Sequence, residues 1–170
     1  CLSLSVHLED IRRIERSRIT GLATLVKSAD GAVLPPLSAF AADDSTPTLF
    51  VSDYGRHFGV VQPVRELVER DARVDHLAHR HTRFGQVHKG VPVFGGVLSV
   101  HENAAGGVYA VHGKFFPIPD DLNPVATLSA QQAFSRAAAT LKHGDPAVES
   151  SRLVVVDPGW YGDPPIGPHL

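Results

Sequence analysis

Residues 81–96, HTRFGQVHKGVPVFGG, decide the fold of this 170-residue chain. Apolar and β-branched residues lie on both sides of Lys89-Gly90, a pair typical of a tight turn. Pro92 cannot donate a hydrogen bond to a neighbouring strand, so it predicts an edge position or the start of a strand. Gly95-Gly96 predicts a bulge or a close backbone approach. The stretch therefore predicts two antiparallel strands that meet at residues 89–90.

Alternating β-branched and aromatic residues predict further strands around this hairpin. The expected strands lie within 19–27, at 65–70, at 77–87, at 97–101 and at 108–112. Turns are expected around residues 71–75 and 103–107, so that consecutive strands run antiparallel. The prediction is a β-meander with one face in the core and the other in water.

An amphipathic helix is expected before the meander. Thr46-Pro47 has the pattern of a helix N-cap followed by the first helical position. The apolar positions that follow, before Gly59 ends the helix, are Leu49, Phe50, Tyr54 and Phe58. We expect this helix to pack against the meander, which gives an α+β fold.

A Pro-rich connector at residues 117–127 is expected to divide the chain into two units. The first is residues 1–116, with its core at about 19–116. The second is residues 128–170, and it begins with a capping box in which Ser129 is the N-cap and Gln132 the third helical position.

The second unit is expected to contain one helix and one strand. The helix should run from the capping box to Lys142, with Gly144 at its C-terminal cap. Its buried stripe is expected to comprise Ala133, Phe134, Ala137, Ala138 and Leu141. Residues 152–156 predict a buried strand, and residues 157–170 predict an extended, irregular tail.

The composition excludes several classes of function. Sixteen Lys and Arg residues against eighteen Asp and Glu residues give a net charge of −2, too balanced for a surface that binds nucleic acid. No apolar run approaches the ~18 residues of a membrane span, so none is expected. Cys1, the single cysteine, fits a lipidated terminus and fits equally a point at which a longer chain was cut. We favour the second and expect no lipid anchor.

The ten histidines do not form a metal-binding pattern. His79, His81 and Arg83 would share one strand face, and a cation among the histidines disfavours a metal ion. His101-Glu102 begins like the helical H-E-x-x-H signature of zinc peptidases, but position 105 is Ala. With no G-x-S-x-G nucleophile motif either, we expect no catalytic residue and no metal site.

Four segments resemble known pro-region modules. Residues 81–96 resemble the central signature of the fungalysin/thermolysin propeptide (FTP) domain. Val111-His112-Gly113 is similar to the Val-Asn-Gly with which that family ends a strand, and Phe58-Gly59-Val60 is similar to the end of its helix. Residues 128–133, LSAQQA, resemble the helix opening of a PepSY domain, the module that usually follows FTP. The resemblance covers roughly residues 20–160.

The resemblance implies a pro-region that assists the folding of a secreted zinc metallopeptidase and inhibits it until cleavage. It implies an FTP-like domain at 1–116 and a partial PepSY-like domain at 128–170, because the chain stops at Leu170 where a further strand is expected. The implied partner is the catalytic domain of the cognate metallopeptidase, which would hold zinc and calcium, whereas this chain would hold no cofactor. The implied location is extracellular or in the cell envelope.

The site residues and the function leave alternatives open. Arg83 and Gln86 are candidate partner contacts, yet each serves equally well as an internal hydrogen-bond anchor, and on a regular strand they face opposite ways. The residues expected to have structural roles are Gly90, Pro92, Gly95, Gly96, Gly113 and Ser129. The alternative functions are an FTP/PepSY binding module that regulates or escorts a protease in trans or in the cell envelope, and an enzyme whose site has no recognisable motif.

Overall fold

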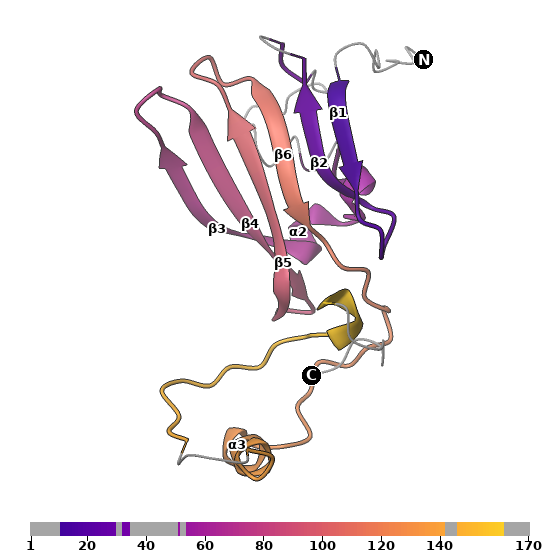
Figure 1. Ribbon diagram of the computed structural model, residues 1–170, viewed down its shortest axis with the longest axis vertical. Coiled ribbons are helices and arrows are strands. Elements are labelled where there is room, and N and C mark those ends of the chain that lie inside the picture. Colours follow the sequence, from indigo (N-terminus) through magenta and orange to yellow (C-terminus); the bar gives the residue numbers. More distant parts are fainter. Residues whose placement is uncertain (1–10, 30–31, 35–50, 52–53, 142–145, 162–170) are drawn as a thin grey trace.

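Six strands form one antiparallel sheet in the order β1-β2-β6-β5-β4-β3 (Figure 1). The strands are β1 (Ile11–Arg16), β2 (Ala23–Ser28), β3 (Leu67–Val74), β4 (Arg80–His88), β5 (Val91–Glu102) and β6 (Val108–Lys114). The helices are α2 (Pro63–Glu66), α3 (Ala130–Ala138) and the 3-10 helix η2 (Pro158–Tyr161). This structure is a computed structural model, and it describes residues 11–29, 32–34, 51, 54–141 and 146–161.

The predicted meander is confirmed as β3 to β6, four consecutive antiparallel strands. The turns predicted at 89–90 and 103–107 are also confirmed. The turn predicted around 71–75 is wrong, because β3 continues to Val74 and the chain reverses over residues 75–79. Asp75 explains the later turn, since its Oδ1 accepts hydrogen bonds from the backbone N–H groups of Leu77 (2.8 Å) and His79 (3.0 Å).

The strands expected within 19–27 and at 65–70 begin at other residues than predicted. The strand expected at 65–70 starts at Leu67, because Pro63 opens the short helix α2. The strand expected within 19–27 is β2, which starts at Ala23 after a loop in which Gly21 N–H donates to Ser17 O. Strand β1 was not predicted, and it extends the sheet eight residues before the expected core boundary at 19. It is an edge strand in which four of the six residues are charged and the two isoleucines, Ile11 and Ile14, do not alternate.

The core lies on one face of the sheet, under the chain that connects β2 to β3. Val51 and residues 54–58 of that connection are helical, and Gly59 ends the helix with φ +94°. Tyr54 and Phe58 are each 1% exposed and belong to one cluster with Leu98 of β5. Burial of each such side chain stabilises the fold by ~1.5–3 kcal/mol. The expected helix is therefore confirmed in this part, while Thr46-Pro47 lies outside the described residues.

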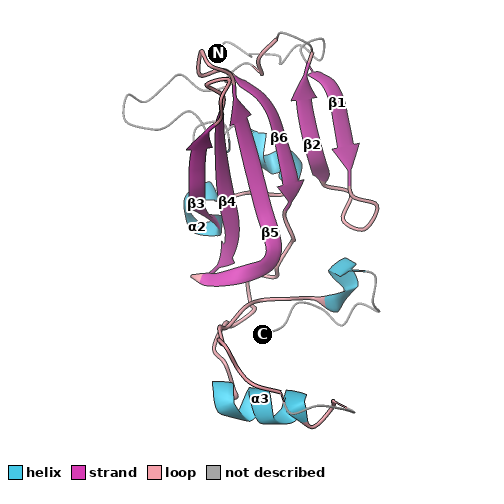
Figure 2. Ribbon diagram, turned by 60° about the vertical axis from the view of Figure 1, so that its left-hand side comes forward, coloured by secondary structure: helices cyan, strands magenta, loops and turns pink. Residues whose placement is uncertain are grey.

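Figure 2 shows that the helical segments before β3 lie together on one side of the sheet, which is the core side. Leu98 and Val100 of β5 point to this core side, so the alternate residues Val97, Ser99 and His101 point to the opposite face. We call that opposite side the open face. One face in the core and one in water is the arrangement that the sequence predicts.

The chain after β6 attaches to the sheet through a second small cluster. Val155 pairs in parallel with Val93 at the start of β5: its N–H donates to Pro92 O (2.9 Å) and its carbonyl accepts from Phe94 N (2.9 Å). Trp160 stacks on Phe116, with ring centroids 4.2 Å apart. The buried members of this cluster are Val93, Phe116, Val155 and Trp160.

These contacts correct two predictions for the second unit. In place of the buried strand expected at 152–156, there is a bridge at Val155, and Arg152 and Leu153 are exposed. The tail expected to be irregular from residue 157 contains η2, in which Asp157 Oδ1 accepts from Gly159 N (2.9 Å). A single bridge forms because Val155 meets only the start of β5.

The capping box of α3 is confirmed, but its expected length and burial are wrong. Ser129 Oγ accepts from Gln132 N (3.2 Å), and Ser129 N donates to Gln132 Oε1 (2.9 Å). The helix ends at Ala138, because Thr140 bonds back to Ala137 O through both N–H and Oγ1. No residue of α3 is buried, and its apolar side lines an open groove of about 630 Å³. Figure 2 shows α3 beyond the end of the sheet.

Candidate functional site

The open face carries a concentration of cationic and imidazole side chains at its centre. They line a pocket of about 130 Å³ that also includes part of Thr82. We call its seven other lining residues the open-face cluster: Asp71, Arg73, His81, Arg83, Ser99, His101 and His112. They come from four adjacent strands, so the sheet positions them together.

Strand register explains why these side chains meet. His81 lies opposite Arg73 on one side and opposite His101 on the other. Ser99 lies opposite Arg83 and opposite His112. Directly opposite residues in antiparallel strands have Cβ atoms ~4.5–5.5 Å apart, so the pairings form a continuous band of contacts across β3 to β6.

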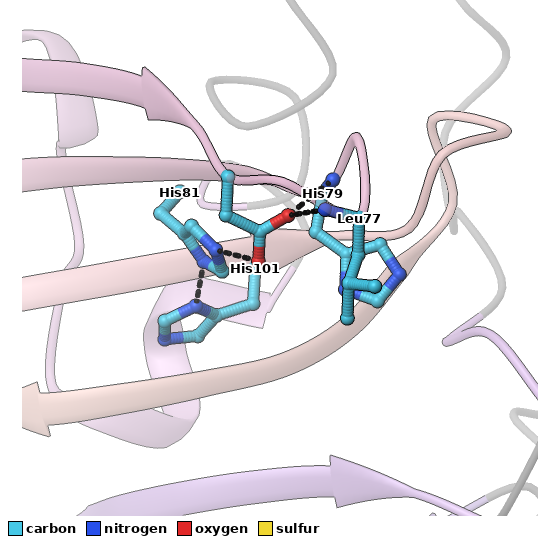
Figure 3. A network of polar contacts seen from close by, with 5 residues as sticks. Leu77, His79, His81 and His101 are labelled. Atoms are coloured by element: carbon cyan, nitrogen blue, oxygen red, sulfur yellow. Dashed lines mark hydrogen bonds and ion pairs between the residues drawn. The ribbon is translucent and has the colours of Figure 1, made fainter.

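Three imidazoles are in contact within the cluster. His81 Nδ1 lies 2.6 Å from His101 Nδ1, and Figure 3 shows the two rings edge to face. His101 also stacks on His112, with ring centroids 4.9 Å apart and an interplanar angle of 18°. A contact between two Nδ1 atoms holds one proton, so simultaneous protonation of both nitrogens would break it.

Asp75 connects the turn after β3 to this imidazole group. Its Oδ2 lies 3.0 Å from His81 Nε2, and its Oδ1 accepts the two backbone bonds of the turn (Figure 3). The hydrogen bond from His81, assisted by those from His79 and Leu77 and opposed by partial desolvation, lowers the pKa of Asp75 to about 2. Asp75 is therefore a carboxylate at neutral pH, and His81 Nε2 is the donor.

His101 sits in an environment that disfavours its protonated form. Burial, followed by the positive charges that His112, His81 and Arg73 contribute, lowers the pKa of His101 to about 4. At neutral pH the His101 ring is therefore uncharged. One of its nitrogens donates a hydrogen bond and the other accepts one, and Nδ1 is engaged with His81, while Arg73 and Arg83 carry the fixed positive charge of the face.

The structure separates the two residues that the sequence selected as candidate contacts. Arg83 is exposed on the open face, within the cluster. Gln86 is 3% exposed: its Nε2 donates to Phe116 O (2.6 Å), and its Oε1 accepts from Phe116 N (2.9 Å). The alternatives were a partner contact and an internal hydrogen-bond anchor. Gln86 has the geometry of the internal anchor, and Arg83 has the exposure that a partner contact needs.

The other selected residues have backbone or packing roles in the structure. A Cβ on Gly96 would lie 2.5 Å from Gln86 Oε1, and a Cβ on Gly113, at φ +148°, would overlap the backbone of Val97 and Leu98. Gly95 lies under Tyr161, and Gly90 forms the turn after Lys89. The prediction at Gly95-Gly96 was a bulge or a close backbone approach; in the structure the atoms nearest these glycines belong to the side chains of Tyr161 and Gln86.

Pro92 and Ser129 complete the selected set. Pro92 is the second residue of β5, as the proline rule predicts, and its carbonyl accepts the bridge bond from Val155 N (2.9 Å). Ser129 caps α3. Neither side chain belongs to the open-face cluster.

The cluster contains no nucleophile arranged for catalysis. Among the described residues, the Ser99 hydroxyl makes no hydrogen bond to an imidazole, which a serine nucleophile and its base require. No group of three or more His, Cys, Asp or Glu side chains within the described ranges could hold a metal ion. The described side chains of this surface provide hydrogen-bond donors and fixed positive charge.

The sequence predicts that His79, His81 and Arg83 share one strand face, but it does not predict the open-face cluster. His81 and Arg83 do share the open face, while His79 lies in the turn, with its ring 5.5 Å from that of Tyr109. His101 and His112 are expected on two different strands, and the sequence predicts no contact between them. The alternation within β5 and β6, combined with the correct register, is the signal that brings them together.

A comparison with protein-family models matches residues 65–115 to the Fungalysin/Thermolysin Propeptide Motif. The match runs from α2 to Phe115 and includes the whole open-face cluster. Comparisons with curated proteins and with solved structures find no match. No helix within the described residues is long and apolar enough to cross a bilayer. Residues 65–115 are therefore similar to a non-catalytic propeptide motif of the fungalysin/thermolysin type.

Proposed function

We propose that this chain is the pro-region of a secreted thermolysin-like zinc metallopeptidase, which it helps to fold and then inhibits until proteolytic cleavage removes it. The observation that carries the proposal is that the propeptide-motif match at 65–115 coincides with one structural unit, the meander β3 to β6. The catalytic zinc, together with calcium, would belong to the peptidase domain. This chain would bind that domain and hold no cofactor itself.

Two physical effects make such a role feasible. Secreted proteases are often separated from their unfolded state by a high kinetic barrier, and a partner complementary to the native surface can lower it during folding. A covalent link also raises the effective concentration of the pro-region to ~mM, so modest affinity is enough to block the peptidase. Cleavage of the link then permits release.

The open face provides a surface for this partner. The opposite face of the sheet is covered by the chain's own core, whereas Arg83 and Arg73 on the open face point into solvent from a rigid sheet. Charged side chains on a preorganised surface steer association and fix the orientation of a complex. We infer that Arg83 is the partner contact of the two candidates, since Gln86 is engaged internally.

We also propose that residues 128–170 belong to a PepSY-like module. The capping box starts α3 where that module's helix is expected, and one side of the helix is apolar. In an α+β module a helix with an apolar side packs on a sheet, and the open groove of about 630 Å³ beside α3 is where such a layer would fit. Val155 then links this module to β5.

The experiment that tests the proposed function starts from the coding sequence beyond residue 170. The proposal requires an in-frame H-E-x-x-H helix there. The encoded peptidase domain is then denatured and refolded with and without an equimolar amount of this chain, and proteolytic activity is measured. We expect active enzyme to be recovered severalfold better with the chain present.

Two results would contradict the proposed function. One is a reading frame without a metallopeptidase, and the other is a refolding yield that the chain does not change. A frame without the peptidase, combined with inhibition of a separately encoded protease, would instead support regulation in trans.

A further inference from the structure

The open-face cluster has more positive than negative groups. Its lining contains two arginines, three histidines and one carboxylate, Asp71. Among the described residues, neither Arg73 nor Arg83 makes a hydrogen bond or an ion pair through its guanidinium. The carboxylate of Asp75 is already bonded to His81 and to the turn. The guanidinium donors are therefore available to a ligand.

The sheet holds the two arginines within reach of one small ligand. Arg73 lies opposite His81, and Asp71 lies opposite Arg83, so the arginines occupy diagonal positions on neighbouring strands. Diagonal neighbours on one sheet face are ~7–8 Å apart, a span that two long side chains can close around a single group. The pocket volume of about 130 Å³ corresponds to ~4 water molecules, enough for one oxyanion.

The imidazoles lie beside these charges, and the ring of His112 adds a donor. His101 and His112 are stacked between the arginine side of the pocket and β2, and their rings are accessible from it. Ser99, which lies opposite both Arg83 and His112, adds a hydroxyl. Arginine, imidazole and hydroxyl donors converging on one pocket match the acceptor oxygens of phosphate and carboxylate groups.

We propose that the open-face cluster is a binding site for a single oxyanion, with Arg73 and Arg83 as the charged donors and with the His112 imidazole and the Ser99 hydroxyl as further donors. His101 Nε2 joins them as a donor when the His101 ring is protonated. The ligand is a phosphate-type anion or the carboxylate of another molecule. The site stands independently of the proposed function, because it needs no peptidase.

Binding at this site must depend on pH. Several charged and titratable groups face the imidazoles. From β3, the turn after it, β4 and β6 these are Asp71, Arg73, Asp75, His79, Arg83 and Tyr109. Lys27 of β2 is on the same face, because it lies opposite Ala110 in the β2–β6 register. Burial, followed by positive neighbours, keeps the pKa of His101 at about 4, and a bound anion would raise it. Binding of an oxyanion whose own charge does not change should therefore tighten as the pH falls from 7 toward 5.

The test is a titration of the isotope-labelled chain, followed by amide and histidine-ring NMR signals. The probes are inorganic phosphate and sodium acetate, each at constant ionic strength, with sodium chloride as the reference salt. We expect saturable shifts confined to β3 to β6, with a Kd of ~1 mM for at least one probe. Phosphate alone saturating would assign the site to phosphate-type anions, and acetate alone would assign it to a carboxylate.

Matched variants separate this site from general screening of charge. Replacing both Arg73→Gln and Arg83→Gln should weaken binding about tenfold. Asp71→Asn should tighten it, because the variant removes the one repelling charge in the lining. Arg136→Gln on α3 is the control and should leave binding unchanged. Thermal unfolding of each variant verifies that it is folded.

Three results would overturn the proposal. They are shifts that do not saturate with either probe at about 20 mM, shifts of equal size with chloride, and binding that the double arginine variant retains in its folded form.

Discussion

Gln86 and Phe116 are joined by two hydrogen bonds, from Gln86 Nε2 to Phe116 O (2.6 Å) and from Phe116 N to Gln86 Oε1 (2.9 Å). A side-chain amide thus pairs with the backbone of a residue 30 positions later. The pair holds the segment that follows β6 against strand β4. Phe116 in turn stacks on Trp160. One buried amide therefore positions the start of the segment that follows β6.

Gln86→Leu should destabilise the protein without changing the open face. The substitution leaves the N–H and C=O of Phe116 buried without their partners, at a cost of about 2–4 kcal/mol in the free energy of unfolding. Urea denaturation followed by circular dichroism measures the loss. Arg83→Gln is the matched control and should change the free energy of unfolding by less than about 0.5 kcal/mol. Equal losses in the two variants would contradict the division between anchor and surface residue.

The histidine cluster should make stability fall on acidification. The folded-state pKa of His101 is about 4, below its ordinary value of 6.5, so the unfolded chain binds more protons between these values. Stability is therefore full above pH 6.5 and decreases as the pH falls toward 4. The loss continues below this range as the Asp75 carboxylate, with its pKa lowered to about 2, becomes protonated.

Comparison with His101→Gln isolates the contribution of that histidine. Melting temperatures are measured for both proteins at several pH values from 7.5 to 4. The variant should lose less stability than the original chain over the interval between the two pKa values, because Gln does not bind a proton there. Parallel curves for the two proteins would show that His101 is not the titrating group.

Gly113→Ala should be strongly destabilising, although the new methyl group is small. At φ +148° the added Cβ would overlap the backbone of Val97 and Leu98, and neither strand can move without breaking the β5–β6 ladder. We expect a loss of about 3 kcal/mol in the free energy of unfolding. Gly106→Ala provides a control at φ +82° with open space around its Cβ, and it should cost less. If both substitutions cost the same, conformational strain and not backbone overlap is the cause.

The meander could be predicted from the sequence because its turns are encoded locally. Lys89-Gly90 and Asn103 specify reversals over a few residues, and Asn103 Oδ1 accepts from both Ala105 N and Gly107 N. β1 could not be predicted in this way, since an edge strand has no apolar face to reveal it. The burial of α3 was predicted from the apolar residues along one side of the helix. Those residues are buried only where another layer of the protein covers them, and no residue of α3 is buried in the structure.

The open-face cluster depends on information that no local pattern contains. His81 and His101 are 20 residues apart, and their contact follows from the β4–β5 register, in which a bulge lies between Gly85 and Val87. A shift of one residue would place every side chain of one strand on the other face. Sequence patterns could therefore suggest that histidines share a face, but not which strands bring them together.

The most direct test of the pro-region proposal is inhibition of the peptidase encoded in the same reading frame. Its mature catalytic domain is incubated with increasing concentrations of this chain, and hydrolysis of a peptide substrate is followed over time. We expect saturable inhibition below tens of micromolar. It should weaken in Arg83→Glu and persist in Arg136→Gln. Undiminished hydrolysis in the presence of excess folded chain would contradict the proposal.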